Sequence, residues 1–217
     1  MTIGNVRTIP SVSSTVRPSR RAWRLAAAAL VATLAVGLSA CAADPTADAF
    51  KNGEQIAYGS GDFRVTEIPE ADRGAAVDFG GVTENGEDFS SDDIRGDVAV
   101  VNFWYAGCGP CRLEAKDLEK TWQKNKADGV HFIGINIYDQ PDTAIAFAET
   151  YGVTYPSLID VTSGDAKLAF AKVTPIQAPP TTLVLDRKGR VAVRIIGPID
   201  GTSILSTLIQ DTLKEKA

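Results

Sequence analysis

A pair of cysteines placed directly between a strand pattern and a helix pattern constrains the fold of this chain more than any other feature. Residues 98–104 form an apolar run around a single asparagine, which is the pattern of a buried strand. Cys108 and Cys111 follow after a break at Ala106 and Gly107, and an apolar helical stripe begins at once. The stripe consists of Cys111, Ala115, Leu118 and Trp122. The C-x-x-C pair is therefore expected at a strand-to-helix turn.

This placement predicts redox chemistry for the two cysteines. A helix N-terminus offers free N–H groups and the positive end of the helix dipole, and both stabilise a thiolate. A free thiol has a pKa of about 8.5, and such surroundings lower it. Cys108 is expected to be the exposed nucleophile, and Cys111 to be the partly covered cysteine that resolves the mixed disulfide. Pro110 suits a first helical turn, and Gly109 lets a substrate backbone approach closely.

A structural disulfide and half of a zinc site are the two other interpretations of this pair. A zinc site requires four ligands, and the chain has three cysteines, one histidine and no second C-x-x-C. The redox interpretation is therefore favoured. No metal is expected, and the redox-active disulfide is expected to act without a further cofactor.

Residues 1–41 have the features of an export signal. They contain five arginines and no acidic residue, and they include an apolar run over 25–38. As a helix this run would be about 21 Å long, shorter than the membrane hydrocarbon core of about 30 Å. The run ends in Leu-Ser-Ala-Cys, which resembles a bacterial lipobox with Cys41 as the lipid-modified first residue of the mature protein. Ordinary signal cleavage is the alternative, and the triplet 19–21 leaves twin-arginine export open beside the Sec route.

Charge and composition divide the remainder of the chain. The chain has 22 basic and 27 acidic residues, and because residues 1–41 hold five of the basic ones, residues 42–217 carry a net charge of −10. A domain this acidic is a poor candidate for binding nucleic acid or anionic lipid. Residues 42–74 are polar, acidic and interrupted by Gly and Pro, which predicts a linker. Residues 75–217 are predicted to form the folded domain.

Strand and helix patterns alternate within the predicted domain. Turn residues at 84–86 separate two short extended segments, 76–82 and 87–89, and predict a hairpin. Helices are expected over 110–127, 141–151, 166–172 and 202–216, and further strands over 130–138, 157–159, 181–186 and 190–196. This order predicts an α/β sheet covered on both faces.

Three stretches of the chain resemble the thioredoxin superfamily, and in particular its extracytoplasmic TlpA/ResA/DsbE-like group. They read GDVAVVNFWYAGCGPCRLEA, YGVTYPSLID and PPTTLVLDRKGRVAVRIIGPI. The Cys-Gly-Pro-Cys motif is identical to that of thioredoxin. The resemblance extends over nearly all of 75–217 and implies a thioredoxin-like fold: a central mixed sheet, helices on both faces and an added N-terminal hairpin.

The resemblance also assigns residues around the cysteine pair. Pro180 corresponds to the cis-proline that faces the cysteines, and Thr181 beside it is expected to help position the substrate. Pro179 departs from the family, because it has no N–H to offer to a substrate backbone. Trp104 matches a family tryptophan that shields the site, with core packing as the alternative. Gly107 stands where the family often has a second tryptophan, so a flatter and less aromatic recognition surface is expected.

Glu114 is the expected proton acceptor or donor for Cys111. It lies three residues further along the helix, so the two side chains are neighbours, and ResA-like proteins have a glutamate there. Asn102 stands where thioredoxin has a buried aspartate, and an amide cannot take up a proton. The alternative role for Glu114 is to complement the helix dipole.

Taken together, the resemblance implies a lipid-anchored thiol:disulfide oxidoreductase on the extracytoplasmic face of the membrane, where disulfides persist. Its expected partners are protein thiols and disulfides, such as those of apocytochrome c, and a membrane thiol-electron donor or acceptor that recycles it. Reduction of selected disulfides is the favoured direction, and disulfide formation in secreted proteins is the alternative. A thiol peroxidase would need other residues at Val101 and Tyr105, and a copper metallochaperone would need a wider cysteine spacing and a histidine partner, for which only His131 is available.

Overall fold

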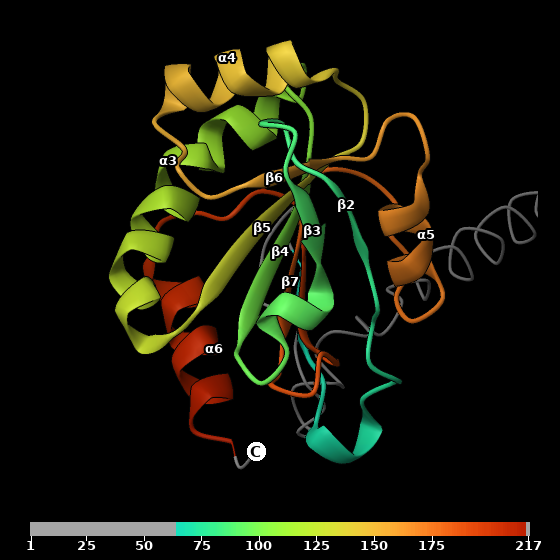
Figure 1. Ribbon diagram of the computed structural model, residues 1–217. Coiled ribbons are helices and arrows are strands. Elements are labelled where there is room, and N and C mark those ends of the chain that lie inside the picture. Colours follow the sequence, from blue (N-terminus) through green and yellow to red (C-terminus); the bar gives the residue numbers. More distant parts are fainter. Residues whose placement is uncertain (1–63, 216–217) are drawn as a thin grey trace, which may run out of the picture. The chain divides into compact units, whose positions relative to one another are not determined.

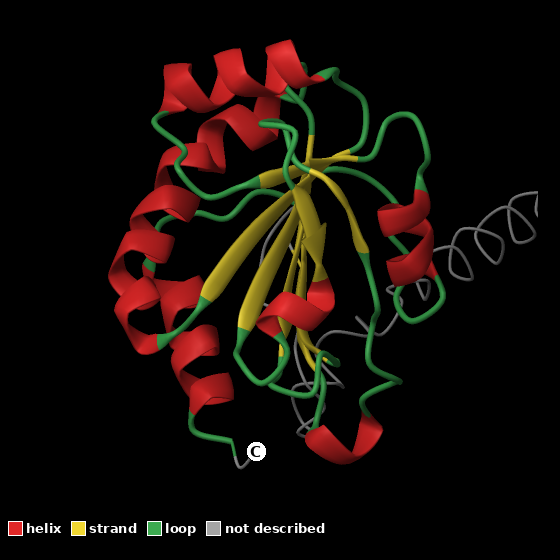
Figure 2. Cartoon of the chain, viewed as in Figure 1, coloured by secondary structure: helices red, strands yellow, loops and turns green. Residues whose placement is uncertain are grey.

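The computed structural model describes residues 64–215, so the predicted signal segment, Cys41 and most of the predicted linker lie outside the described residues. The described chain forms a six-stranded sheet with helices on both faces and a separate two-stranded hairpin (Figures 1 and 2). The sheet contains β1 (Arg64–Glu67), β4 (Ala99–Trp104), β5 (His131–Asn136), β6 (Ser157–Ile159), β7 (Thr181–Leu185) and β8 (Val191–Ile196). The helices are α3 (Gly109–Asn125), α4 (Pro141–Tyr151), α5 (Asp165–Ala171) and α6 (Ser203–Leu213). The hairpin pairs β2 (Gly80–Val82) with β3 (Asp88–Ser90), and the short 3-10 turns are η1 (Glu70–Asp72), η2 (Ser91–Ile94) and η3 (Lys126–Asp128).

The strand order β1-β8-β7-β4-β5-β6 makes this a mixed sheet. The strands β4, β5 and β6 run parallel to one another, whereas β7 is antiparallel to β4, β8 to β7 and β1 to β8. Both the mixed sheet and the N-terminal hairpin confirm the predicted fold. Because β7 is antiparallel to β4, the loop before β7 lies at the same end of the sheet as the turn after β4.

Alternation along β4 sends its side chains to two different cores. Val101 and Phe103 join the apolar cluster that α5 and the β2–β3 hairpin cover. Val100 joins the cluster beneath α3 and α6 on the opposite face, and Asn102 points to the same side as Val100 because side chains alternate along a strand. In Figure 1, α3 and α6 lie on one side of the sheet and α5 on the other, while α4 crosses above its end. Within residues 64–215, every helix is too short or too polar to cross a membrane.

The folded domain begins earlier than the predicted boundary at residue 75. Strand β1 pairs with β8 over four residues, and Val65 is half-buried against the cluster beneath α6. Arg73 forms a buried ion pair with Asp186. The prediction that 42–74 is a linker is therefore wrong for residues 64–74. An edge strand needs few apolar residues, so the polar composition of this segment concealed it.

Candidate active site

The cysteine pair lies at the strand-to-helix turn, as predicted. Strand β4 ends at Trp104, Cys108 caps the N-terminus of α3, and the helix begins at Gly109. The Cys108 Sγ atom accepts a hydrogen bond of 3.1 Å from the backbone N–H of Cys111. The two cysteines are joined by a disulfide bond, so the structure shows the oxidised form. The same N–H group and the helix dipole would stabilise a thiolate on Cys108 after reduction.

Both cysteines are buried, which corrects the expectation of an exposed Cys108. Only 3% of Cys108 and 2% of Cys111 is exposed, and both belong to an apolar cluster with Trp104. In the disulfide the Cys108 sulfur is bonded to a cysteine one turn inside the helix, and this draws it into the cluster. Gly109 and Pro110 are exposed beside the disulfide, as are Gly107 before Cys108 and Arg112 after Cys111.

The peptide bond between Pro179 and Pro180 is cis, the conformation that the family resemblance implied. Pro180 is buried, and its carbonyl accepts a hydrogen bond of 2.9 Å from the N–H of Gly197. Thr181 pairs with Phe103 of β4, one residue before the strand ends, so this loop lies beside the redox turn. The Thr181 hydroxyl donates a hydrogen bond of 2.8 Å to the carbonyl of Ala178. Thr181 is buried, and this hydrogen bond ties it to the loop that precedes Pro180.

Glu114 is completely buried one turn after Cys111, and it is held by groups from two other elements. Its Oε1 atom accepts a hydrogen bond of 2.9 Å from the Asn102 amide, and its Oε2 atom accepts one of 2.8 Å from the backbone N–H of Ile199. The Asn102 amide also donates to the Thr182 hydroxyl at 3.0 Å. Burial raises the pKa of Glu114 to about 7, although the hydrogen bonds from Ile199 and Asn102 act to lower it. The carboxyl group is therefore poised to exchange a proton near neutral pH.

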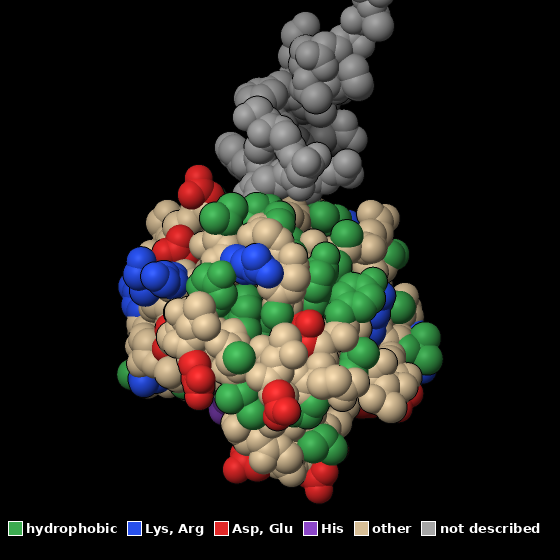
Figure 3. All heavy atoms as spheres, turned by 90° about the horizontal axis from the view of Figure 1, so that it is seen from above, with side chains coloured by type: hydrophobic (Ala, Val, Ile, Leu, Met, Phe, Trp, Pro, Cys, Tyr) green, Lys and Arg blue, Asp and Glu red, His purple; other side chains and the backbone are tan. Residues whose placement is uncertain are grey.

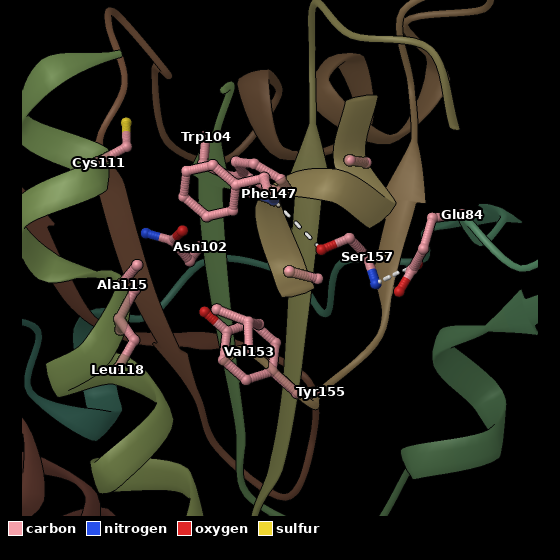
Figure 4. A pocket seen from close by; sticks show the side chains of 12 residues that line it. Glu84, Asn102, Trp104, Cys111, Ala115, Leu118, Phe147, Val153, Tyr155 and Ser157 are labelled. Carbon is pink, nitrogen blue, oxygen red and sulfur yellow. Dashed lines mark hydrogen bonds between the residues drawn. The ribbon is translucent and has the colours of Figure 1, made fainter. Parts of the chain in front are cut away.

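A small cavity lies behind the disulfide, between α3, the end of β4 and α4 (Figure 4). It leaves about 10 Å³ for the centre of a water molecule, which is room for roughly one water. Its lining includes Asn102, Trp104, Cys111, Phe147, Tyr155 and Ser157. The Trp104 Nε1 atom donates a hydrogen bond of 3.2 Å to the Ser157 hydroxyl, and its ring centroid lies 4.4 Å from that of Phe147. Trp104 thus forms a buried wall of the cavity. This position is compatible with both predicted roles, shielding of the cysteine pair and core packing.

Sequence reasoning missed several partners of this site. Thr182, Tyr155 and Ser157 lie within stretches that resemble the family, but nothing in their spacing identifies them as neighbours of Asn102 or Trp104. Burial raises the pKa of the Tyr155 hydroxyl, and the nearby Glu114 carboxylate adds to the effect. Ile199 contributes through its backbone N–H, and no side-chain pattern could have indicated that contact.

The described residues offer little to a metal ion. Among residues 64–215, no group of three or more His, Cys, Asp or Glu side chains is arranged to hold one. His131 lies at the start of β5, and its Nε2 atom is 3.0 Å from a carboxylate oxygen of Asp97.

Aromatic side chains stand beside the redox turn, although Gly107 leaves the expected tryptophan position empty. The rings of Tyr105 and Tyr138 meet edge to face with centroids 4.9 Å apart, and 62% of Tyr138 is exposed. The expectation of a flatter and less aromatic surface than in the family stays a prediction, and Tyr105 and Tyr138 supply two rings beside the turn. The second aromatic residue comes from the loop after β5, which is not adjacent to the motif in the sequence.

Comparison with known proteins places this geometry among thiol-disulfide proteins. Residues 73–194, more than half of the chain, match the model of the AhpC/TSA family. The chain is 36% identical over 117 residues to the thioredoxin-like protein YneN of Bacillus subtilis (strain 168), covering 52% of this chain and 65% of YneN. It is 31% identical over 122 residues to the thiol-disulfide oxidoreductase ResA of Geobacillus kaustophilus (strain HTA426), covering 56% of this chain and 67% of ResA. The match therefore spans less than two thirds of the length of YneN.

Solved structures agree with these relatives. The crystal structure of a secreted thiol-disulfide isomerase from Corynebacterium glutamicum superposes with a TM-score of 0.62 at 26% identity, covering 74% of this chain and 99% of that one. A thiol:disulfide interchange protein from Chlorobium tepidum TLS superposes with a TM-score of 0.60 at 28% identity, covering 67% of this chain and 99% of that one. The six-stranded mixed sheet with its flanking helices is thus a thioredoxin-like fold.

Proposed function

Because this chain belongs to the AhpC/TSA family of thioredoxin-like proteins, we propose that it is a thiol:disulfide oxidoreductase whose reacting groups are Cys108 and Cys111. The observation that carries the proposal is the disulfide between these cysteines at the first turn of α3, where an N–H group points at the Cys108 sulfur. The names of relatives such as ResA support the same class of reaction.

In the reducing direction, the reaction begins with the Cys108 thiolate, which attacks one sulfur of a substrate disulfide. A mixed disulfide forms, and the other substrate sulfur leaves as a thiolate that takes up a proton. Cys111 then gives up its proton and attacks the Cys108 sulfur, so that the Cys108–Cys111 disulfide forms and the second substrate sulfur leaves. Two electrons and two protons have then passed to the substrate, and a dithiol donor must reduce the pair again.

Glu114 is proposed to take the proton from Cys111 in the second step. A carboxyl group with a pKa of about 7 is half ionised at neutral pH, so it can accept and return a proton in each cycle. Asn102 and the Ile199 N–H hold both carboxyl oxygens in place. In this proposal Asn102 is a positioning residue, because its amide orients Glu114 but carries no proton.

Substrate is proposed to approach over Gly109 and Pro110, which are exposed beside the disulfide. On the other side lies the loop of Pro179 and Pro180, which the pairing of Thr181 with Phe103 places next to the end of β4. Pro179 offers a substrate backbone a carbonyl group but no N–H. Binding is therefore proposed to depend on side-chain contacts more than on a backbone ladder.

The cellular setting is proposed from the sequence. A lipid anchor at Cys41 would hold the domain on the extracytoplasmic face of the membrane, and a secreted neighbour of the same fold is in keeping with export. Reduction of selected protein disulfides, such as those of apocytochrome c, is the proposed direction, with a membrane thiol-electron donor as the recycling partner. Disulfide formation in secreted proteins is the alternative direction, and neither requires a cofactor beyond the cysteine pair.

The reduction potential of the cysteine pair tests the proposal and its direction together. The protein would be equilibrated with glutathione or dithiothreitol buffers, and the reduced fraction measured by thiol alkylation. A value near that of thioredoxin, about −270 mV, is expected for a reductant. A value near that of DsbA, about −120 mV, would instead indicate a disulfide donor. If the pair resisted reduction under native conditions, the disulfide would be structural and the proposed function would be wrong.

A further inference from the structure

Gly107, directly before Cys108, leaves room for an aromatic ring from a neighbouring residue. A Cβ atom placed on Gly107 would lie 3.2 Å from Cε2 and 3.4 Å from Cδ2 of Tyr105. These distances are tight, so the Tyr105 ring fills the space that a side chain at position 107 would enter. The Tyr105 ring, from two residues earlier in the chain, thus occupies the space beside Gly107 where a side chain at position 107 would lie.

The Tyr105 ring is extended by Tyr138, which is largely exposed. The two rings meet at 78° with centroids 4.9 Å apart. Tyr138 follows β5, the parallel neighbour of β4, so the two tyrosines come from adjacent loops at the same end of the sheet. Figure 3 looks onto the end of the molecule where α3 begins and shows hydrophobic side chains gathered across the middle of that face. We refer to Tyr105 and Tyr138 as the tyrosine pair.

Hydrogen bonds hold both loops of the tyrosine pair in place. The Asp139 carboxylate accepts hydrogen bonds from the Ala106 N–H at 2.6 Å and from the Asn136 amide at 2.9 Å. The Asn136 side-chain oxygen in turn accepts hydrogen bonds from the backbone N–H groups of Tyr138 and Asp139 at 3.1 and 2.8 Å. The loops after β4 and β5 are therefore joined by side chains. A surface fixed in this way loses little conformational entropy when a partner binds.

We propose that the tyrosine pair binds a large apolar side chain, aromatic above all, that lies next to the reacting cysteine in an extended segment of a partner protein. This inference rests on the proposed function and deepens it by naming a class of substrate. Tyrosine is enriched in protein interfaces because its ring supplies large contact area at a small cost in side-chain entropy. An exposed, edge-packed pair fits an aromatic partner, since rings favour edge-to-face and offset contacts.

The position of the pair relative to Cys108 limits what can occupy it. The Tyr105 carbonyl accepts a hydrogen bond of 3.1 Å from the Cys108 N–H, so the two residues belong to one turn, and Tyr105 packs against the apolar cluster that contains both cysteines. A substrate joined to Cys108 by a disulfide must therefore run past this turn. One residue of extended chain spans about 3.3 to 3.6 Å, so a side chain one or two positions from the substrate cysteine comes within reach of the rings. On the opposite side Pro179 gives no N–H to the substrate backbone, which leaves side-chain contacts to select the sequence.

The test measures how fast the reduced full chain reduces two symmetric peptide disulfides. The peptides are identical except that the residue after the single cysteine is tryptophan in one and glycine in the other. Because each peptide is joined to a second copy of itself, attack at either sulfur leaves the same peptide on Cys108 and releases two peptide thiols in all. Wild type is expected to reduce the tryptophan peptide about fivefold faster than the glycine peptide.

Variants of Tyr138 and of a control residue show whether the difference in rate between the two peptides depends on the tyrosine pair. Tyr138→Ala should bring the ratio of the two rates close to one, and Tyr138→Phe should keep the ratio. Leu168→Ala is the matched control, because Leu168 is a similarly exposed apolar residue on α5, 58% exposed and remote from the redox turn. An unchanged ratio in Tyr138→Ala, or a ratio of one in wild type, would overturn the inference while leaving the proposed function standing. If wild type reduced neither peptide, the proposed function and this inference would both be wrong.

Discussion

Two buried carboxylates at opposite ends of the sheet show how differently this fold treats the same chemical group. Glu114 lies near the end of β4 that carries the redox turn, and within residues 64–215 its hydrogen-bond donors are two neutral groups, the Asn102 amide and the Ile199 N–H. Asp186 follows β7 at the end of the sheet where β4 begins, and its Oδ2 atom lies 2.9 Å from Nη1 of Arg73 and from Nε of Arg190. We call these regions the redox end and the clamp end.

The two carboxyl groups titrate in opposite directions from their ordinary values. At the redox end, burial raises the pKa of Glu114 to about 7, and two neutral hydrogen bonds do not reverse the effect. At the clamp end, burial also raises the pKa of Asp186, but the hydrogen bonds from Arg190 and Arg73 outweigh it and lower the pKa below its usual value. Burial raises the pKa of both carboxyl groups, and the hydrogen bonds outweigh it only at Asp186, where the Arg190 backbone N–H is joined by the side chains of Arg73 and Arg190. The carboxylate that joins distant segments is thus paired with arginines, whereas the carboxyl group proposed to transfer a proton is held by neutral donors.

The largest effect is expected from Asp186→Asn at the clamp end. Asp186→Asn takes one carboxylate partner from Arg73, whose side chain is only 4% exposed and which keeps Glu215, and it also takes the partner of Arg190. The loss should be about 3 to 4 kcal/mol in the free energy of unfolding. The pKa of Asp186 is lower in the folded protein than in the unfolded chain. The ionised carboxylate therefore stabilises the fold at every pH above its unfolded pKa, and this stabilisation is lost only as pH falls through its folded pKa. The loss should therefore be the same at pH 5 and pH 8 in urea denaturation of the oxidised protein.

A matched control for that measurement is Asp211→Asn. Asp211 pairs with Lys214 at 2.8 Å, but 55% of its side chain is exposed, so the change should cost about 0.5 kcal/mol or less. A similar cost for the two variants would show that the clamp is not a buried ion pair in solution.

The second prediction concerns the pH dependence of stability, which Glu114→Gln should change. The folded pKa of Glu114 is about 7 against an ordinary value of 4.5, so the native state holds this proton more tightly than the unfolded state. The stabilisation that the protonated Glu114 gives to the folded state is therefore fully present below pH 4.5. It is lost as pH rises to 7, which lowers the free energy of unfolding by about 3 kcal/mol in all. Glu114→Gln should remove this slope, which unfolding of both oxidised proteins at pH 5 and pH 8 would reveal. Parallel wild-type and variant curves would mean that Glu114 is ionised throughout this range.

The redox end was the more predictable of the two from sequence. The apolar run, the C-x-x-C and the helical stripe are consecutive, so local rules were enough to place Cys108 and Cys111 at the first turn of a helix. Glu114 could be linked to Cys111 by helix spacing alone. Its contact with Ile199 joins residues far apart in the chain, and the Tyr138 ring comes from another loop, so neither follows from a local pattern.

The clamp end was not predicted because its residues look like surface residues. Arg73 lies in a polar segment that composition assigned to a linker, and Asp186 lies in a turn whose charges are typical of solvent-exposed hairpins. Only the register of β7 and β8 brings Arg190 and Asp186 together, and only the path of the chain after β1 brings Arg73 to them. Charged residues that become buried by pairing carry no hydrophobic signal, which is why the predicted domain boundary was placed too late.

The third prediction separates the two ends by reaction rate. If Glu114 accepts the proton of Cys111, the release of a substrate from its mixed disulfide with Cys108 should speed up as pH rises through about 7. Glu114→Gln should slow this step about tenfold or more near pH 7 and shift its rise toward the ordinary thiol value of about 8.5. Stopped-flow measurement of thiol release from pH 5.5 to 9 would show the shift. Asp186→Asn should leave the profile in place under conditions where it remains folded, and an unchanged profile in Glu114→Gln would remove the proton-transfer role.

The smallest effects on the reaction are expected from glycine substitutions, which compare the two ends once more. At the redox end, a Cβ on Gly107 would press on the Tyr105 ring, with 3.2 Å to its Cε2 atom, so the ring must shift slightly. Gly107→Ala should lower the preference for a tryptophan-containing peptide about twofold, because a displaced ring fits its partner less well. Stability should hardly change, since the Tyr105 ring is only half-buried and can give way.

At the clamp end, Gly189→Ala should lower stability and leave peptide selectivity unchanged. Gly189 has a φ of +75°, and its Cβ would collide with the guanidinium of Arg95. The change should cost about 1 to 2 kcal/mol of stability, because an L-residue is strained in this conformation. The ratio of the two peptide rates should stay at its wild-type value, since Gly189 lies at the far end of the sheet from the tyrosine pair. If Gly189→Ala lowered the peptide selectivity along with the stability, while Gly107→Ala changed neither, the assignment of substrate selection to the redox end and of stability to the clamp end would be contradicted.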